Sequence, residues 1–73
     1  MSEEVRAELS GNVWKVLITA GQEVSEGDTL IILESMKMEI PVTAESSGKI
    51  ATVEVAEGDS VQEEQLLLLL NPS

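Results

Sequence analysis

The sequence of 73 residues contains no cysteine, histidine, tyrosine or phenylalanine and only one tryptophan. Without cysteine it has no disulfide framework and no thiolate ligand for a metal. Without histidine it also lacks the commonest general base, and the thiol nucleophile is missing with the cysteine. Paired carboxylates remain, but so short a chain offers little cleft to hold a substrate between them. We therefore expect that the chain is not an enzyme by itself.

Positive charge is scarce as well. Four Lys and Arg residues face fourteen Asp and Glu residues, which gives a formal net charge of −10. A phosphate backbone would repel such a chain, so we expect no nucleic-acid binding. The two aspartates, Asp28 and Asp59, are far apart and form no calcium-loop motif; they are interpreted as turn residues, and no metal site is expected. The acidity serves solubility or steers the chain toward electropositive partners.

Long apolar segments are also absent. No run reaches the roughly 20 apolar residues that a membrane helix needs. The acidic start, Met1 to Glu4, lacks the apolar core of a signal peptide. We expect a cytoplasmic monomer that does not contact membranes, with a single domain over residues 1–73 and a core over about residues 5–70.

The second half of the sequence repeats the first with a shift of 37 positions. Identical residues recur in this register, namely Gly11 with Gly48, Val16 with Val53, Gly21 with Gly58, Val24 with Val61, Glu26 with Glu63, and Leu30 with Leu67. Half of so short a repeat cannot bury its own apolar face, so the two halves should pack on each other. The repeat therefore predicts a pseudo-two-fold sandwich or flattened barrel.

Short apolar runs alternate with turn signals along both halves. The runs cover Val13–Ile18, Thr29–Leu33, Lys49–Val55 and Leu66–Leu70, and the turns Glu26–Asp28 and Glu57–Asp59 separate them. Periodicity alone leaves buried helices open, but the regular glycine spacing favours the short strands of an all-β fold. Pro41 lacks an amide donor, which predicts an edge position or a bulge for its strand.

Lys37 has 36 residues on each side. It lies between a predicted strand that ends near Glu34 and one that begins near Met38, so Met36 and Lys37 would form the tip of a two-residue hairpin. A two-fold relation between the halves places the counterpart of this tip at the chain termini, and the lysine then projects from the opposite end. Alone, Lys37 would be interpreted as an ordinary solvated charge. The flanking methionines argue against this, because two exposed Met side chains favour neither solubility nor packing.

The segment Glu34–Val42 closely resembles the acceptor motif of biotinyl domains, the biotin carboxyl carrier family. The resemblance extends from about Val5 to Leu70 and includes Gly21, Gly27 and Ser47-Gly48; Ser35 stands where these domains usually have Ala. The short length is most similar to stand-alone biotin/lipoyl attachment proteins. The resemblance implies an all-β flattened barrel of two antiparallel sheets with quasi-two-fold symmetry and the lysine at an exposed hairpin.

The resemblance also implies a function. Biotin would be attached covalently to Lys37 by a biotin ligase, with Met36 and Met38 as recognition residues. Glu34 and Glu39 would be either further recognition residues or solvated flanks of the tip. The domain would then carry carboxybiotin between a biotin carboxylase and a carboxyltransferase. A lipoyl carrier, or a dual acceptor served by a lipoyl ligase, is the first alternative; lipoyl acceptors typically have Asp before and Ala after the lysine, which favours biotin here. A small β-barrel interaction module with an unmodified lysine is the second.

Overall fold

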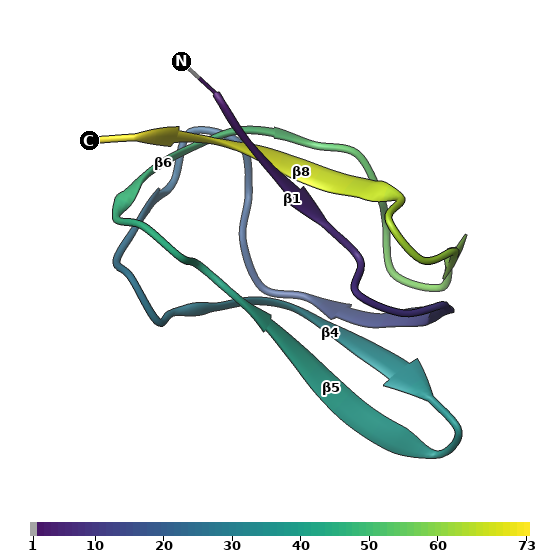
Figure 1. Ribbon diagram of the computed structural model, residues 1–73. Coiled ribbons are helices and arrows are strands. Elements are labelled where there is room, and N and C mark those ends of the chain that lie inside the picture. The colour runs from purple at the N-terminus through teal and green to yellow at the C-terminus, as the bar shows by residue number, and fades with distance from the viewer. Residues whose placement is uncertain (1) are drawn as a thin grey trace.

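The computed structural model describes residues 2–73, so that Met1 lies outside it, and it forms two four-stranded antiparallel sheets (Figure 1). The strands are β1 (Glu3–Arg6), β2 (Gly11–Val16), β3 (Glu23–Val24), β4 (Thr29–Ser35), β5 (Met38–Thr43), β6 (Gly48–Val53), β7 (Ser60–Val61) and β8 (Leu66–Pro72). The strand orders are β1-β8-β6-β3 and β5-β4-β2-β7. The predicted all-β fold of two antiparallel sheets is confirmed. Within residues 2–73 there is no helix that is long and apolar enough to cross a membrane.

The two halves are related as the repeat predicted. A shift of 37 positions carries β2, β3 and β4 onto β6, β7 and β8 with the same bounds. The irregularities follow the same rule, because the β2–β4 ladder skips Trp14 and the β6–β8 ladder skips its counterpart, Ala51. Each sheet takes two strands from each half. The halves are therefore interleaved, and the predicted quasi-two-fold symmetry is confirmed.

The core between the sheets is aliphatic. Its most deeply buried side chains are at most 1% exposed. One of them, Ile50, is on β6, and the others come from the equivalent strands β4 and β8: Leu30, Ile31, Leu33, Leu67, Leu68 and Leu70. Among the described residues no polar or charged residue is buried. Full burial of each such side chain contributes about 1.5–3 kcal/mol relative to an exposed one. Hydrophobic packing between the sheets thus holds the two halves together.

Four tight turns share one hydrogen-bonding device. In each, a side-chain oxygen accepts a hydrogen bond from the backbone N–H three residues earlier: Gln22 from Thr19 (3.2 Å), Asp28 from Ser25 (2.8 Å), Asp59 from Ala56 (2.9 Å) and Gln65 from Gln62 (3.0 Å). Short polar side chains stabilise turns in this way. The interpretation of Asp28 and Asp59 as turn residues is therefore confirmed.

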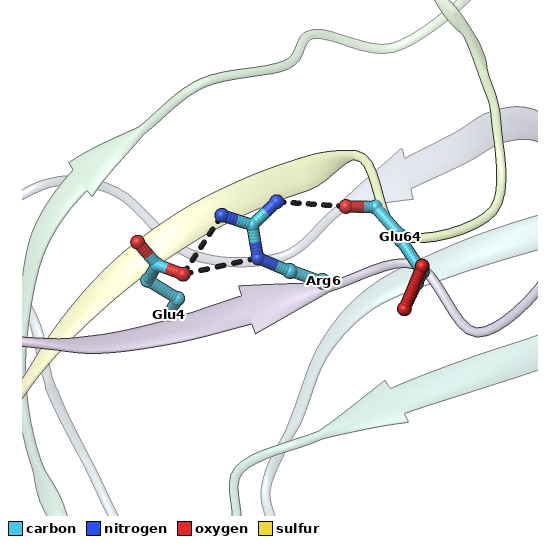
Figure 2. Close-up of polar contacts among 3 residues, drawn as sticks. All are labelled: Glu4, Arg6 and Glu64. Carbon is cyan, nitrogen blue, oxygen red and sulfur yellow. Dashed lines mark hydrogen bonds and ion pairs between the residues drawn. The ribbon is translucent and has the colours of Figure 1, made fainter.

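Arg6 fastens the edge strand β1 to the turn that precedes β8 (Figure 2). Its Nε and Nη2 donate to Glu4 Oε1 at 3.0 and 2.7 Å, and its Nη1 donates to the carbonyl oxygen of Glu64 at 2.8 Å. Both side chains of the ion pair are about half exposed, so the pair contributes no more than about 1 kcal/mol. Arg6 therefore has a structural role, because it holds β1 to the turn before β8.

Gly48 begins β6 at a point where β8 passes close to it. A Cβ at this position would lie 2.8 Å from Pro72 Cα and would collide with the carbonyl oxygen of Asn71. We expect Gly48→Ala to lower the free energy of unfolding by about 2–3 kcal/mol. The backbone atoms that the new Cβ would meet belong to the β6–β8 ladder, so they cannot move away without disturbing the pairing of the two strands. Chemical denaturation measures the loss. Thr52→Ala, an exposed change on the same strand, is the control and should cost no more than about 1 kcal/mol; equal losses in the two variants would contradict the close-approach argument.

Candidate functional site

The predicted hairpin is formed by β4 and β5, with Met36 and Lys37 as its loop. The register pairs Ser35 with Met38, then Glu34 with Glu39. The φ angles are 53° at Met36 and 65° at Lys37. Two successive residues in the left-handed region form a type I′ turn, the connection whose twist matches that of the flanking strands. The two-residue tip predicted from the sequence is therefore confirmed.

The tip has an unusual composition for this turn. Type I′ turns favour Asn-Gly, because a side chain with a Cβ resists positive φ. The left-handed conformation costs about 1–2 kcal/mol per residue, and both Met36 and Lys37 adopt it. The register holds them there, because Leu33, which pairs with Ile40 two pairs before the closing one, is only 1% exposed and anchors the hairpin in the core. Backbone strain of this kind concentrates at functional sites.

All three tip side chains are exposed. Met36 is 92% and Met38 61% exposed, and the side chain of Lys37 is exposed as well. The molecule is elongated, 34 × 18 × 17 Å, and the β4–β5 hairpin lies at the end opposite both termini (Figure 1). This geometry agrees with the position that the repeat predicted for the lysine. A second protein can therefore enclose the amine without meeting the chain ends.

Two carboxylates face each other at the base of the tip. Glu34 and Glu39 are directly opposite on adjacent strands, and both are exposed. Like charges in this arrangement are destabilising. Within residues 2–73 the ion pair that forms is Arg6 with Glu4, so no cation among these residues pairs with the two carboxylates. They form a negative site that a cation of a partner could bind, and their role in recognition stays a prediction.

The tip offers an exposed primary amine. A primary amine on a long flexible stem can form an amide with an activated acid, but it must first lose a proton. Within residues 2–73 no His, Cys, Asp or Glu cluster could hold a metal ion. A groove of about 150 Å³ runs between β1 and β5, and Met36, Lys37 and Met38 are not part of its lining. The tip and this groove are therefore separate parts of the surface.

Gly11 supports the hairpin in a way that sequence reasoning missed. It begins β2, and a Cβ there would lie 2.6 Å from the carbonyl oxygen of Glu34 and 3.3 Å from Ser35 Cβ. Gly48 makes the equivalent approach to β8 in the other half. The identity of Gly11 and Gly48 in the repeat was the available signal. Gly11 lets β2 pass close beside the hairpin base.

Comparison with known proteins places this geometry in a family. A family model described as "Biotin-requiring enzyme" (Biotin_lipoyl) matches residues 1–70. The chain is 42% identical over 71 residues to the "Biotinylated protein TB7.3 homolog" of Mycobacterium leprae, which covers 97% of this chain and 100% of that relative. It is 46% identical over 69 residues to the "Biotin/lipoyl attachment protein" of Bacillus subtilis, which covers 94% of each.

A solved structure shows the same fold. The chain is similar to part of a single-chain, multi-domain long-chain acyl-CoA carboxylase, with a TM-score of 0.94 and 29% identity. The match covers 99% of this chain and 7% of that protein. Family model, relatives and fold agree over nearly the whole length. The chain therefore belongs to the biotin/lipoyl attachment family.

Proposed function

We propose that Lys37 is the residue to which biotin is attached, and that the chain carries the group between the active sites of a biotin-dependent carboxylase without catalysing a step itself. One observation carries this proposal: Lys37 occupies a strained, exposed type I′ tip between two exposed methionines. An ordinary surface turn gains nothing from this arrangement. A site that a modifying enzyme must enclose does.

The attachment step is amide formation at Lys37 Nζ. With biotin activated as an adenylate, the new N–C bond forms as the C–O bond to AMP breaks, and the amine gives up a proton. The loop places no base beside the amine, since its neighbours are Met36 and Met38. These side chains also offer no nucleophile that would compete for the electrophile. The base therefore belongs to the biotin ligase.

The transport step follows from the position of the tip. Lys37 would hold the biotin, and the attached group would supply a site that can take up a carboxyl group at a biotin carboxylase and release it at a carboxyltransferase. Lys37 holds it at one end of the elongated molecule, so that the body of the domain stays outside both active sites (Figure 1). Tethering raises the effective concentration of the group at the second site. The proposal places the chain in the cytoplasm, where ATP for the adenylate is available.

Lipoate is the second candidate for the same lysine. The name of the Bacillus subtilis relative includes both groups, which supports keeping a dual acceptor in view. Nothing in the amine chemistry separates the two, because both acids form the same amide. Discrimination must therefore depend on the side chains around the tip, and the exposed pair Met36 and Met38 is best placed to provide it.

The double variant Met36→Asp/Met38→Ala tests both the function and the discriminator. We expect wild type to gain one biotinyl group from a biotin ligase with ATP, and the double variant to react at least about tenfold more slowly and to gain lipoate more readily. Intact mass is the readout for both ligases on both proteins. Stability should change by no more than about 0.5 kcal/mol, because both methionines are exposed and Asp tolerates positive φ better than Met.

Met36→Leu/Met38→Leu is the matched control. It keeps two apolar side chains at the tip and should be biotinylated at close to the wild-type rate. A wild type that gains no biotin would overturn the proposed function. Equal biotinylation of wild type and the Asp/Ala variant would show that the methionines do not discriminate, and unfolding of that variant would contradict the exposed geometry.

A further inference from the structure

Exposed apolar side chains gather on one of the two sheets. Within residues 2–73 the large exposed ones are Trp14 (43%), Leu17 (50%), Met36 (92%) and Met38 (61%). All four lie on β2, its extension or the β4–β5 hairpin; the amide of Leu17 donates to the carbonyl of Leu30 at 3.0 Å and so continues the β2–β4 ladder. Biotin attachment accounts for the two methionines. Trp14 and Leu17 remain unexplained.

The register places these residues beside the hairpin on the outer face of the sheet. One row runs from Asn12 through Glu34 to Glu39, and the next from Lys15 through Ile32 to Pro41. Trp14 is the extra residue of β2 between the two rows, and Lys15 Nζ lies 5.5 Å from the centre of its ring. We call this surface the hairpin-side face, made of Asn12, Trp14, Lys15, Leu17, Ile32, Glu34, Glu39 and Pro41. Their inward neighbours on β2 and β4 form the core, as the alternation of a strand requires.

The other half of the repeat shows what the fold itself requires at these positions. The corresponding pairs are Trp14 with Ala51, Leu17 with Glu54, Pro41 with Glu4, Glu34 with Asn71, and Glu39 with Ser2. The second sheet thus has the same architecture, with small or polar residues at the counterparts of Trp14, Leu17 and Pro41 and uncharged residues at those of Glu34 and Glu39; Ile32 corresponds to Leu69 and is apolar in both halves. Neither feature is needed for folding. Both are therefore available for a contact with a partner.

We infer that the hairpin-side face is the surface on which the biotin ligase docks, with Trp14 and Leu17 as its apolar anchors; this rests on the proposed function. The tip alone consists of three side chains. The surface area that they offer is far smaller than the roughly 1,000 Å² that a specific interface buries. Ile32 and Met36 are four residues apart, which is about 13 Å along a strand. Ile32 pairs with Lys15, the neighbour of Trp14, so a protein that encloses the tip also reaches Trp14.

The chemistry of the face defines the matching surface of the ligase. Tryptophan is enriched among the residues that dominate binding energy, because it buries a large, rigid side chain. The unpaired carboxylates of Glu34 and Glu39 call for a cation on the partner, beside an apolar patch that covers Trp14 and Leu17. Because the acidic pair lies between the apolar anchors and Lys37, it also fixes the direction in which the tip enters the active site.

The test replaces each anchor residue with the residue found at the equivalent position in the other half of the repeat. Trp14→Ala and Leu17→Glu reproduce what the equivalent positions Ala51 and Glu54 already carry, so the fold should tolerate them. In steady-state biotinylation by a biotin ligase, with ATP and biotin saturating, we expect the combined variant to raise the KM for the carrier at least about tenfold. The kcat should stay within about twofold of wild type, since Met36, Lys37 and Met38 are unchanged.

Two controls separate docking from charge and from packing. Thr52→Glu adds the same negative charge on the opposite sheet and should leave KM unchanged. Trp14→Phe keeps an aromatic anchor and should recover most of the wild-type KM. Thermal midpoints and amide NMR dispersion report folding, and if Trp14→Ala unfolds, Leu17→Glu alone at its half-exposed position provides the test.

The outcomes are distinguishable. An unchanged KM in folded variants, with wild type labelled, would refute this docking surface and leave biotin attachment intact. A wild type that is not labelled would refute the proposed function itself. Normal labelling combined with impaired carboxyl transfer from the biotinylated variant would show that a carboxylase component, not the ligase, docks on this face, and would overturn the assignment.

Discussion

The Lys37→Arg variant should gain no biotin under conditions that label wild type to completion. The guanidinium of arginine is not deprotonated at usable pH, so the variant presents no nucleophile at the tip. The change keeps the charge and nearly the length of the side chain. Lys37 is exposed and makes no ion pair within residues 2–73, so the fold and the approach of a ligase should be unaffected.

Another lysine provides the matched control. Lys15 and Lys49 are also exposed, but they lie within β2 and β6, where a ligase cannot close around them as it can around a hairpin tip. The variant Lys49→Arg, which lies outside the hairpin-side face, should therefore be labelled like wild type. Intact mass gives the number of groups, and peptide mapping gives their position. Biotin on the Lys37→Arg variant would overturn the assignment of the site.

The strands that carry the core could be predicted, because their apolar runs recur at a fixed shift. The predicted ends were displaced: Val13–Ile18 was expected, whereas β2 spans Gly11–Val16, although Ile18 remains in the core at 5% exposed. The two-residue strands β3 and β7 were not predicted, since two residues carry no periodicity. Strand β1, with the sequence EEVR, lacks an apolar run and forms because β8 offers it an edge.

The place of the tip could be predicted, but its backbone could not. A two-residue loop between strands fixes the pairing of Glu34 with Glu39, so their opposition follows from the sequence. The positive φ of Met36 and Lys37 does not, because the local signal for such a turn is Asn or Gly. Glu64, with a φ of 70°, is a similar case, since its counterpart in the first half is Gly27. In both places the strands on either side impose a conformation that the residues themselves disfavour.

A chain that ends after Met36 should not fold. In the complete molecule β1 pairs with β8 and β3 pairs with β6, so both strands lose their only partners in residues 2–36, and β2–β4 is the one pairing left. Two-stranded units are at best marginally stable in water. The buried residues of β4, among them Leu30, Ile31 and Leu33, would lose most of the core in which they are buried, because β6 and β8 supply much of it.

The expected result is a collapse of amide chemical-shift dispersion and the loss of a cooperative thermal transition. The complete chain, measured under the same conditions, is the reference for both signals. Because each half supplies two strands to each sheet, the effect should be all-or-none rather than a modest loss of stability. Well-dispersed amide shifts from residues 1–36 alone would show that this half folds by itself, and that the interleaving of the two halves is not what stabilises the domain.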